Sequence, residues 1–418
     1  MAMHTEVGSP VWWSQLRLKL PAPVQAARQT QGVIKQKNSS VLPYILTLND
    51  GQEYGVVVKL VDLHANSYRD KQHRDRSTQS YKAESGFYKH FAHRLHDAKA
   101  KIPELLHEKW QPDDAGVTVI MEDLRNNISS QATTRLMHQA LALDYPQAVL
   151  ALKWLSKMHA ACWGASPSGI WPKGAYWTLE KRRNDLGNIP KEWNEVLLAF
   201  ANTFPVVFSR PAVKELGPRL AAVANDISQM LDIDTDPLQG LQTIIHGDFK
   251  TANLFFSPSA EAASAASETA PGSMAASVSA CDFQWSGGGL AVTDVMYLLW
   301  TSVSPAVIHD REDDLLRCYH RLLQHELQQQ HQKHDVPVYT YDQFCRHYQL
   351  AYLDYVRFLV GAMWGAVTPN SCNELAQDIN QGIHKRCAEH LAHMVDKADV
   401  LLSKLEEDWL EKRQPRTF

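Results

Sequence analysis

The fold of this chain is decided by residues 245–256, which read IHGDFKTANLFF, and by residues 281–284, which read CDFQ. Asp248 and Asn253 are five residues apart, a spacing that lets one tight loop return both side chains to one cleft. The β-rich residues on either side of this loop predict short strands. Asp282 follows another β-rich run, so we expect it at the end of a neighbouring strand, where it would complete the site.

Asp248, Asn253 and Asp282 are the kinds of side chain that phosphoryl transfer requires. The reaction needs a carboxylate near the attacking hydroxyl and oxygen ligands that hold Mg²⁺ against the phosphates of the donor. A His-Gly-Asp tripeptide alone is more typical of an ordinary turn with a core histidine. The added Asn253 and the Asp-Phe-Gln motif favour a phosphotransfer site over that alternative.

Upstream of these motifs, the pattern predicts a β-hairpin. An Asn-Asp-Gly turn at 49–51 separates the β-rich runs 41–48 and 54–61, a strong hairpin signal. Lys59 lies inside the second run, and a lysine in an apolar strand needs an anionic partner. Glu84 is the expected partner because it shares one face of a predicted helix with three apolar residues. These are Phe87, Tyr88 and Phe91.

The rest of the chain predicts an α+β fold. Further short strands are expected at 103–106 and 117–121, and strands largely end at Glu122-Asp123-Leu124. Helical periodicity follows, interrupted by the β-rich runs 243–256 and 278–285. The clearest helices are expected at 145–163, 216–231, 313–330, 341–367 and 372–409. A small antiparallel β lobe with one main helix therefore precedes a large, mostly helical lobe.

Residues 257–280 form a low-complexity stretch with 9 Ala and 7 Ser among 24 residues. This composition buries too little apolar surface to offset its ordering entropy. We therefore predict that this stretch is a flexible insertion in a hairpin that connects residues 245–256 to residues 281–284.

Composition excludes several classes of function. The 418 residues suffice for two lobes, and 42 basic against 46 acidic residues give a net charge of −4. Without a basic excess, nucleic acid is not an expected partner. No apolar stretch approaches the roughly 20 residues that span a bilayer. Residues 1–13 lack the features of a secretory signal, so the cytoplasm is the expected compartment.

Taken together, the motifs resemble the kinase-like phosphotransferase superfamily of aminoglycoside phosphotransferases and choline kinases, closest to its ecdysteroid kinase-like branch. Members show a strand lysine, a helix glutamate, a linker, an HGDxxxxN loop and a DFQ-like motif in that order, and this chain has all five. The resemblance implies a protein-kinase-like two-lobe fold. Residues 1–124 would form the nucleotide-binding lobe and linker, and residues 125–418 the catalytic and acceptor-binding lobe.

The resemblance also implies residue roles and the cofactors ATP and Mg²⁺. Asp248 would orient or deprotonate the acceptor hydroxyl, and Lys250 would contact the γ-phosphate. Asn253 and Asp282 would hold the metal. The remaining positions would contact the nucleotide: Lys59 with Glu84 and the serines Ser39 and Ser40 at its phosphates, and the backbone of Glu122 and Leu124 at adenine.

Two further positions match the family. Asp294 would brace the catalytic loop from the following helix, although a helix N-cap role is compatible. His159, in the helix before the loop, is expected to be structural.

The expected function is ATP-dependent transfer of the γ-phosphate to a hydroxyl of a small molecule. A protein kinase is the first alternative, since Lys250 lies two residues after Asp248 as in the protein-kinase loop. Against it, Gly247 replaces the arginine that reads a phosphorylated activation loop, and Asp294 follows Asp282 by only 12 positions. A pseudokinase is the second alternative, and the intact motif residues argue against it. A metallophosphoesterase would need a Gly-Asn-His-type motif, which this sequence lacks.

Overall fold

The computed structural model describes residues 7–30, 32, 34–35, 38–64, 70–126, 137–235, 238, 240–258, 275–330 and 338–413. The chain divides into two compact units. Unit 1 comprises Met1–Gln139 and Leu254–Gln284, and unit 2 comprises Ala140–Asn253 and Trp285–Phe418. The predicted division at residue 124 separates a nucleotide-binding part from a catalytic part, whereas the two units are defined by their internal contacts. That division stays a prediction.

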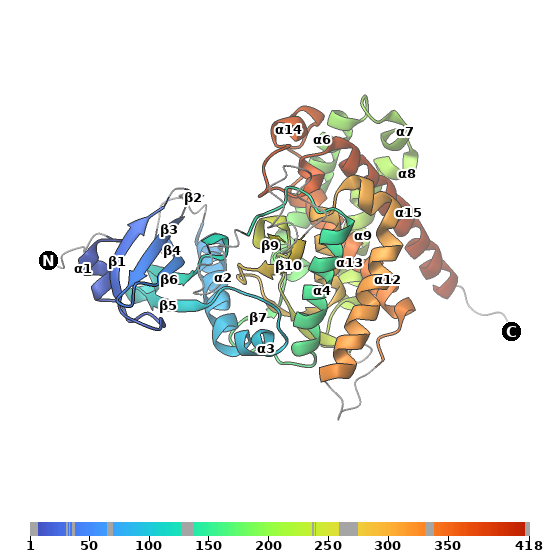
Figure 1. Ribbon diagram of the computed structural model, residues 1–418. Coiled ribbons are helices and arrows are strands. Elements are labelled where there is room, and N and C mark those ends of the chain that lie inside the picture. Colours follow the sequence, from blue (N-terminus) through green and yellow to red (C-terminus); the bar gives the residue numbers. More distant parts are fainter. Residues whose placement is uncertain are drawn as a thin grey trace. The chain divides into compact units, whose positions relative to one another are not determined.

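Unit 1 is built on an antiparallel sheet in the order β1-β3-β4-β6-β5, with β2 paired to β3 (Figure 1). The predicted hairpin is formed by β3 and β4, whose strands close through the pair Thr47↔Glu53. Buried Leu46, Val56, Val58 and Ile120 form a core with Trp13 on one side of the sheet. The strands are β1 (Val24–Gln29), β2 (Ile34–Lys35), β3 (Ser39–Leu48), β4 (Glu53–Asp62), β5 (Leu105–Trp110) and β6 (Gly116–Glu122).

The edge strand β1 was not expected from the sequence. Of its residues, VQAARQ, only Val24 is β-branched and none is aromatic, and most of them are exposed. The strand forms because the backbone of β3 offers a partner, from Val24↔Leu48 to Gln29↔Tyr44.

The main helix of unit 1 is α2 (Lys71–His90), which is N-capped by the Asp70 side chain. Its buried face includes Tyr81, Glu84 and Phe87, which confirms that Glu84 points inward. Two short helices complete this part of the unit, α1 (Pro10–Ser14) and α3 (Ala92–Asp97).

A hairpin of β9 (Leu254–Pro258) and β10 (Ala275–Ala280) completes unit 1 and confirms the predicted pairing around Phe256↔Val278. Leu254, which follows Asn253, pairs with Ala280, two residues before Asp282. The expected insertion at 257–280 is therefore shorter than predicted, because strand pairing extends to Pro258↔Ala275. The central part of that insertion, 259–274, lies outside the described residues.

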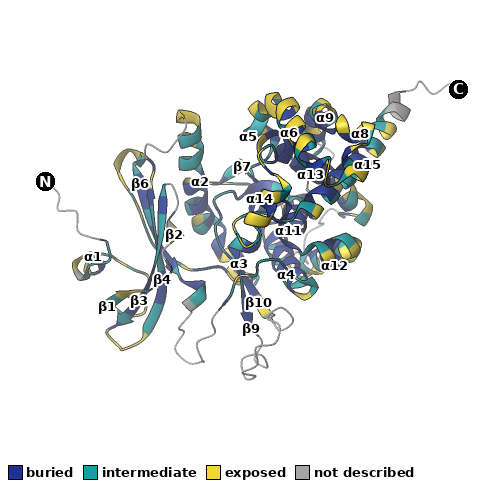
Figure 2. Cartoon of the chain, turned by 90° about the horizontal axis from the view of Figure 1, so that it is seen from above, coloured by how far each residue is buried: buried dark blue, intermediate teal, exposed yellow. Residues whose placement is uncertain are grey.

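Unit 2 is largely helical around a small sheet in the order β7-β11-β8. Its long inner helices are dark blue in Figure 2, and 15 of the 22 residues of α13 are buried. The main helices are α4 (Tyr145–Ala161), α6 (Ile189–Phe200), α9 (Leu216–Met230), α11 (Val292–Ser302), α12 (Pro305–Gln330), α13 (Tyr341–Ala362) and α15 (Ala388–Arg413). The shorter elements are α5 (Leu179–Arg182), α7 (Pro205–Phe208), α8 (Pro211–Lys214), α14 (Pro369–Glu374), β7 (Trp171–Lys173), β8 (Gln242–Ile245) and β11 (Gly287–Leu290).

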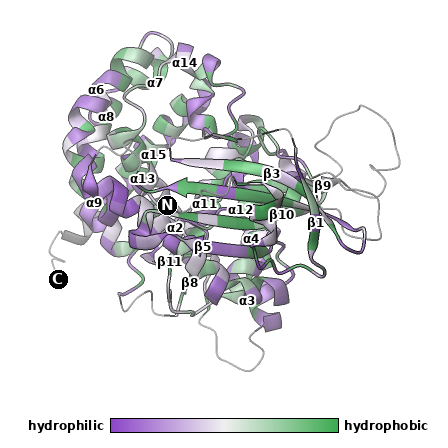
Figure 3. Ribbon diagram, turned by 90° about the vertical axis from the view of Figure 1, so that its left-hand side faces the viewer, coloured by the Kyte–Doolittle hydropathy of each residue, from purple (hydrophilic) through white to green (hydrophobic). Residues whose placement is uncertain are grey.

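In Figure 3, β3 is largely green, whereas α9 carries hydrophilic purple stretches. The α+β expectation, with an N-terminal antiparallel sheet and a mostly helical C-terminal region, is confirmed. Within the described ranges, no helix combines the length and apolarity that crossing a bilayer requires.

The continuous helix expected at 372–409 is wrong. α14 ends at Glu374, a 3₁₀ turn covers Ile383–Lys385, and α15 begins at Ala388. The side chain of Asp378 accepts the backbone N–H of Asn380 at 3.0 Å, an Asx turn that competes with helix. The helical periodicity of the sequence continues across this break and conceals it.

Candidate active site

Lys59 and Glu84 form the ion pair that their sequence context predicts. Lys59 Nζ lies 2.9 Å from Glu84 Oε2, and both side chains are nearly buried. Burial alone would lower the pKa of Lys59, but the charges of Glu84 and Asp282 outweigh it and raise that pKa above its usual value. One ammonium therefore serves two carboxylates in unit 1.

Residues 282–284 are fixed against α2. The Phe283 ring stacks on Phe87 with ring centroids 3.8 Å apart, and the backbone of Phe283 hydrogen-bonds to the Glu84 carboxylate. Ser80 Oγ donates to Gln284 Oε1 at 3.3 Å. Asp282 itself adopts a left-handed backbone with φ 69°. Such a conformation costs about 1–3 kcal/mol for a non-glycine residue and is concentrated at functional sites.

Two buried carboxylate oxygens in this cluster have no hydrogen-bond partner among the described residues. They are Oδ1 of Asp282 and Oε1 of Glu84. A buried acceptor without a partner is costly unless another group satisfies it. With one lysine against two carboxylates, the cluster carries surplus negative charge, and its donor set fits a hard cation such as Mg²⁺.

In unit 2, the loop at 246–253 is shaped by a glycine. Gly247 has φ 77°, and a Cβ there would lie 2.2 Å from the Trp285 carbonyl oxygen and 2.6 Å from the Ala175 nitrogen. Only glycine fits this turn without a clash. The middle position of the His-Gly-Asp tripeptide is thereby fixed by sterics.

Asp294 braces this loop from α11, as the family resemblance implied. Its fully buried carboxylate accepts the backbone N–H of His246 at 2.6 Å and that of Gly247 at 2.9 Å. His159 Nε2 lies 3.1 Å from the same carboxylate, and His159 Nδ1 lies 2.7 Å from the Tyr319 hydroxyl. His159 is thus a structural residue that supports the brace.

Asp248 is surrounded by donors. The Tyr297 hydroxyl donates to its Oδ1 at 2.7 Å, and Lys250 Nζ lies 3.1 Å from its Oδ2. Asn253 Nδ2 donates to the Asp248 carbonyl oxygen at 2.8 Å and to Oδ2 at 3.3 Å. The amide orientation of Asn253 therefore leaves its Oδ1 as the oxygen suited to a metal.

A second lysine lies near Lys250. Burial lowers the pKa of Lys385, and the neighbouring Lys250 ammonium lowers it further. Lys385 belongs to the 3₁₀ turn Ile383–Lys385, beside the buried His384 and Arg386. A second positive charge close to Lys250 favours an incoming anion there.

The remaining predicted nucleotide contacts all lie in unit 1. Ser39 is buried at the start of β3 and hydrogen-bonds to Tyr81, while Ser40 pairs with Leu60 in the β3–β4 ladder. Glu122 ends β6, and its backbone N–H donates to the Glu104 carbonyl at 3.0 Å. Leu124 is buried at the start of the 3₁₀ turn Leu124–Asn126.

The structure thus collects Lys59, Glu84 and Asp282 in unit 1 and Asp248, Lys250 and Asn253 in unit 2. Sequence reasoning missed Tyr297 and Lys385. Tyr297 follows Asp294 by three residues, a helical spacing that puts both side chains on the loop side of α11. That spacing is the sequence signal that could have identified Tyr297. Lys385 follows an unexpected helix break, and no sequence pattern pointed to it.

A model described as the ecdysteroid kinase-like family matches residues 47–332, more than half of the chain. A search of curated protein sequences returned no match. Among solved structures, the chain is similar to the microcompartment-associated aminopropanol kinase, with 11% sequence identity and a TM-score of 0.40. That comparison covers 92% of this chain and 93% of the other.

The family match, the α+β fold and the two residue clusters support a kinase-type phosphotransferase. The chain belongs to the ecdysteroid kinase-like family. The resemblance stated from the motifs is confirmed.

Proposed function

We propose that this protein is an ATP-dependent kinase that transfers the γ-phosphate of ATP to a hydroxyl group of a small molecule. The observation that carries the proposal is the Asp248 loop, whose backbone is held by Asp294 and whose carboxylate is held among Tyr297, Lys250 and Asn253. A positioned carboxylate is required for the attack of a hydroxyl on a phosphoryl group.

The nucleotide would be handled by the residues of unit 1. Lys59, held by Glu84, would contact the α- and β-phosphates, with Ser39 and Ser40 as further phosphate contacts. The buried Ser39 reaches that role only through its backbone or after its bond to Tyr81 is released. For adenine, the carbonyl of Glu122 and the backbone of Leu124 are the proposed partners, because the Glu122 N–H is engaged by Glu104.

Mg²⁺ would be held by Asp282 and Asn253, and it would supply charge neutralisation at the β- and γ-phosphates. Among the described residues, no three His, Cys, Asp or Glu side chains are grouped as a metal site. Mg²⁺ typically takes one or two protein carboxylates and fills its other positions with phosphate oxygens and water. The unpartnered Oδ1 of Asp282 fits that mode of binding.

A small acceptor is favoured over a peptide because the segment after Asp282 is short. Residues 287–290 form strand β11 between β7 and β8, and α11 begins at Val292. This connection has no room for the long activation segment that a protein kinase uses. The Trp285 ring contacts the rings of Trp171 and Tyr176 in unit 2. These three partly exposed aromatic residues would suit an acceptor with an apolar body.

The function is tested by measuring ADP release from MgATP with water and with a panel of amino alcohols, sugars and steroid alcohols. Asp248→Asn should lower turnover by about 10²- to 10⁴-fold, the usual contribution of a positioned acid or base, and leave MgATP affinity nearly unchanged. Asp282→Ala should instead weaken MgATP in calorimetry, because the metal loses its anionic ligand.

Retention of more than about half of the activity in Asp248→Asn would contradict the role of Asp248. MgATP binding without turnover by any acceptor would favour the pseudokinase alternative. Phosphorylation of a protein substrate but none of the alcohols would favour a protein kinase.

A further inference from the structure

Two tyrosine hydroxyls lead away from the Asp248 carboxylate. Tyr297, which is 2% exposed, donates to Oδ1 at 2.7 Å, and the Tyr176 hydroxyl lies 3.0 Å from the Tyr297 hydroxyl. The Tyr297 hydroxyl has a single proton, and its bond to Oδ1 commits that proton to Asp248. The bond between the two hydroxyls must therefore be donated by Tyr176.

A second series of hydrogen bonds points in the same direction. The Trp364 indole, which only donates, bonds to His384 Nδ1 at 3.1 Å, so Nδ1 must be the acceptor. Burial lowers the pKa of His384 well below its usual value, which keeps the ring neutral with its proton on Nε2. Nε2 then donates to the Tyr355 hydroxyl at 3.1 Å, and Tyr355 is left to direct its own proton at the adjoining Tyr176.

The two sides of the Asp248 carboxylate thus differ in kind. Oδ1 is held by Tyr297, a neutral hydroxyl kept in place by packing on the Trp177 ring, with ring centroids 4.4 Å apart. Oδ2 faces Lys250 and Asn253, the side chains proposed above to serve the γ-phosphate and the metal. Bound MgATP would attract Lys250 and Asn253, the partners of Oδ2, but not Tyr297, the partner of Oδ1.

We propose that Tyr297 and Tyr176 are positioning residues that occupy Oδ1 of Asp248 and leave Oδ2 as the atom that accepts the proton of the acceptor hydroxyl. This inference rests on the proposed function. In the step, the acceptor O–H bond breaks and its proton goes to Oδ2. The acceptor oxygen bonds to the γ-phosphorus, and the bond from that phosphorus to the bridging oxygen breaks with ADP keeping the electron pair.

The test compares Tyr297→Phe, Tyr176→Phe and the double variant, with MgATP and water as the acceptor as well as the alcohol panel. Tyr297→Phe should lower kcat about 10- to 100-fold, the range for a hydrogen bond to a charged group, with KM for MgATP unchanged. Tyr176→Phe should lower kcat about threefold, the range for a neutral hydrogen bond. Because Tyr176 acts through Tyr297, the double variant should be no slower than Tyr297→Phe alone.

Tyr352→Phe is the matched control. Its buried hydroxyl donates to the Met394 carbonyl at 2.8 Å and not to Asp248, so kcat should stay at the wild-type value. If Tyr297→Phe does not fold, the kcat of Tyr176→Phe carries the test by itself.

The inference is overturned if the two single losses multiply in the double variant, if Tyr297→Phe changes KM rather than kcat, or if neither variant differs from Tyr352→Phe. In those cases an active wild type leaves the proposed function standing. A wild type that releases no ADP with water or any alcohol overturns the proposed function and this inference together.

Discussion

At the scale of single residues, Gly247 shows how strictly sterics restrict the loop that carries Asp248. Its left-handed backbone disfavours any L side chain, and the Trp285 carbonyl oxygen occupies the place of a Cβ. These two costs are separable because Gly164 has a similar φ of 69°, yet a Cβ at that position would have nothing within 4 Å of it.

We expect Gly247→Ala to destabilise unit 2 by more than Gly164→Ala, which should cost only the backbone strain of about 1–2 kcal/mol. The clash with Trp285 should add to this for Gly247 alone and should also displace Asp248, so turnover falls as well. Urea unfolding and ADP release measure both effects. Equal stability losses in the two variants would show that the loop relaxes around the methyl group.

The residues that could be predicted from the sequence are those whose chemistry conflicts with their surroundings. Lys59 in an apolar strand and Glu84 on an apolar helix face each require a partner of opposite charge, and in the structure they form an ion pair with each other. Tyr297 and Lys385 could not be found in this way. A tyrosine in an apolar helix conflicts with nothing, and Lys385 approaches Lys250 only through tertiary structure.

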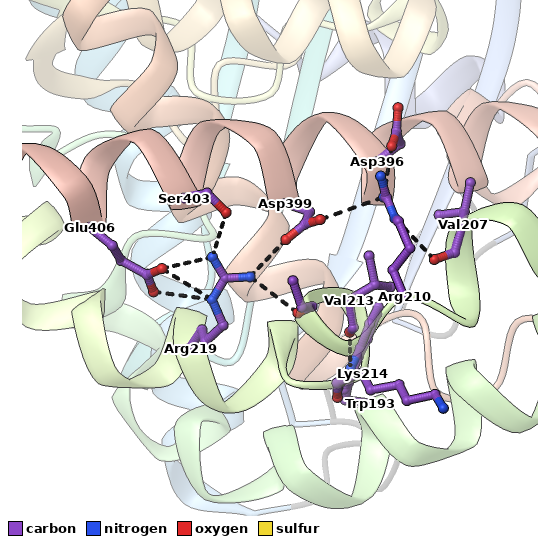
Figure 4. A network of polar contacts seen from close by, with 11 residues as sticks. Trp193, Val207, Arg210, Val213, Lys214, Arg219, Asp396, Asp399, Ser403 and Glu406 are labelled. Atoms are coloured by element: carbon purple, nitrogen blue, oxygen red, sulfur yellow. Dashed lines mark hydrogen bonds and ion pairs between the residues drawn. The ribbon is translucent and has the colours of Figure 1, made fainter.

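At the scale of elements, a polar network joins α15 to the α8–α9 region of unit 2 (Figure 4). Arg219 on α9 donates to Asp399 at 2.7 Å, to Ser403 at 2.9 Å and to Glu406 at 2.7 Å. Arg210 pairs with Asp396 at 2.7 Å. The four partners are spaced along one face of α15, so the network fixes both the position and the rotation of this helix.

Arg219→Met should destabilise unit 2 by about 1–3 kcal/mol, since it leaves the largely buried Asp399 carboxylate without its closest cation. Lys191→Met is the control, because Lys191 is 80% exposed and its pair with Glu192 is 3.9 Å long. Thermal unfolding of both variants makes the comparison. A control as damaging as Arg219→Met would show that charge removal, rather than this network, is responsible.

The β9–β10 hairpin predicts tolerance of a large deletion. Pro258 and Ala275 are paired across the hairpin, so a short Gly-Ser turn in place of residues 259–274 joins ends that already adjoin. Shortening a loop costs little, since closure entropy changes by only about 0.6 kcal/mol per doubling of length. Fold and ADP release should therefore be preserved. A folded deletion variant without turnover would identify 259–274 as a functional element.

Elements were predictable where local pattern and tertiary role agree. The β3–β4 hairpin has both a turn signal and apolar strands, and its register follows. Strand β11 reads Gly-Gly-Gly-Leu, a composition that disfavours strands. It can pair with β7 because Gly287 has no Cβ, which would lie 2.4 Å from the Trp171 carbonyl oxygen. Such close backbone approach leaves no periodic pattern in the sequence.

At the scale of the whole molecule, buried histidines link stability to pH. His390 lies between Trp300 and His309, with its Nε2 3.1 Å from the Trp300 carbonyl oxygen and His393 stacked on the same indole. Burial lowers the pKa of His390 to about 3, and the neighbouring His309 and His393 contribute. Burial likewise lowers the pKa of His309 and of His347 to about 4.

The sign of the effect follows from proton counting. Below about pH 6.5 these histidines bind protons in the unfolded chain but not in the folded unit. The free energy of unfolding therefore decreases as the pH is lowered, until the pH reaches the folded pKa. His390 can contribute at most about 1.4 kcal/mol per pH unit. We expect the midpoint urea concentration for unfolding to be lower at pH 5 than at pH 7.

The matched variant for this prediction is His390→Phe, which keeps a ring against Trp300 but cannot titrate. Its urea midpoint should depend less steeply on pH than that of wild type, whereas His93→Gln, at an exposed position of α3, should leave the slope unchanged. Parallel curves for wild type and His390→Phe would contradict the assignment.

The discontinuity of unit 1 has a consequence for biosynthesis. Its first part, Met1–Gln139, leaves the ribosome before residues 140–253, which belong to unit 2, and only then does Leu254–Gln284 follow. Phe87 therefore waits for its stacking partner Phe283 through 196 intervening steps (283 − 87) of elongation. At 5–20 residues per second this interval lasts roughly 10 to 40 s. Until it ends, the Phe87 ring on α2 lacks the Phe283 ring that covers it in the folded chain.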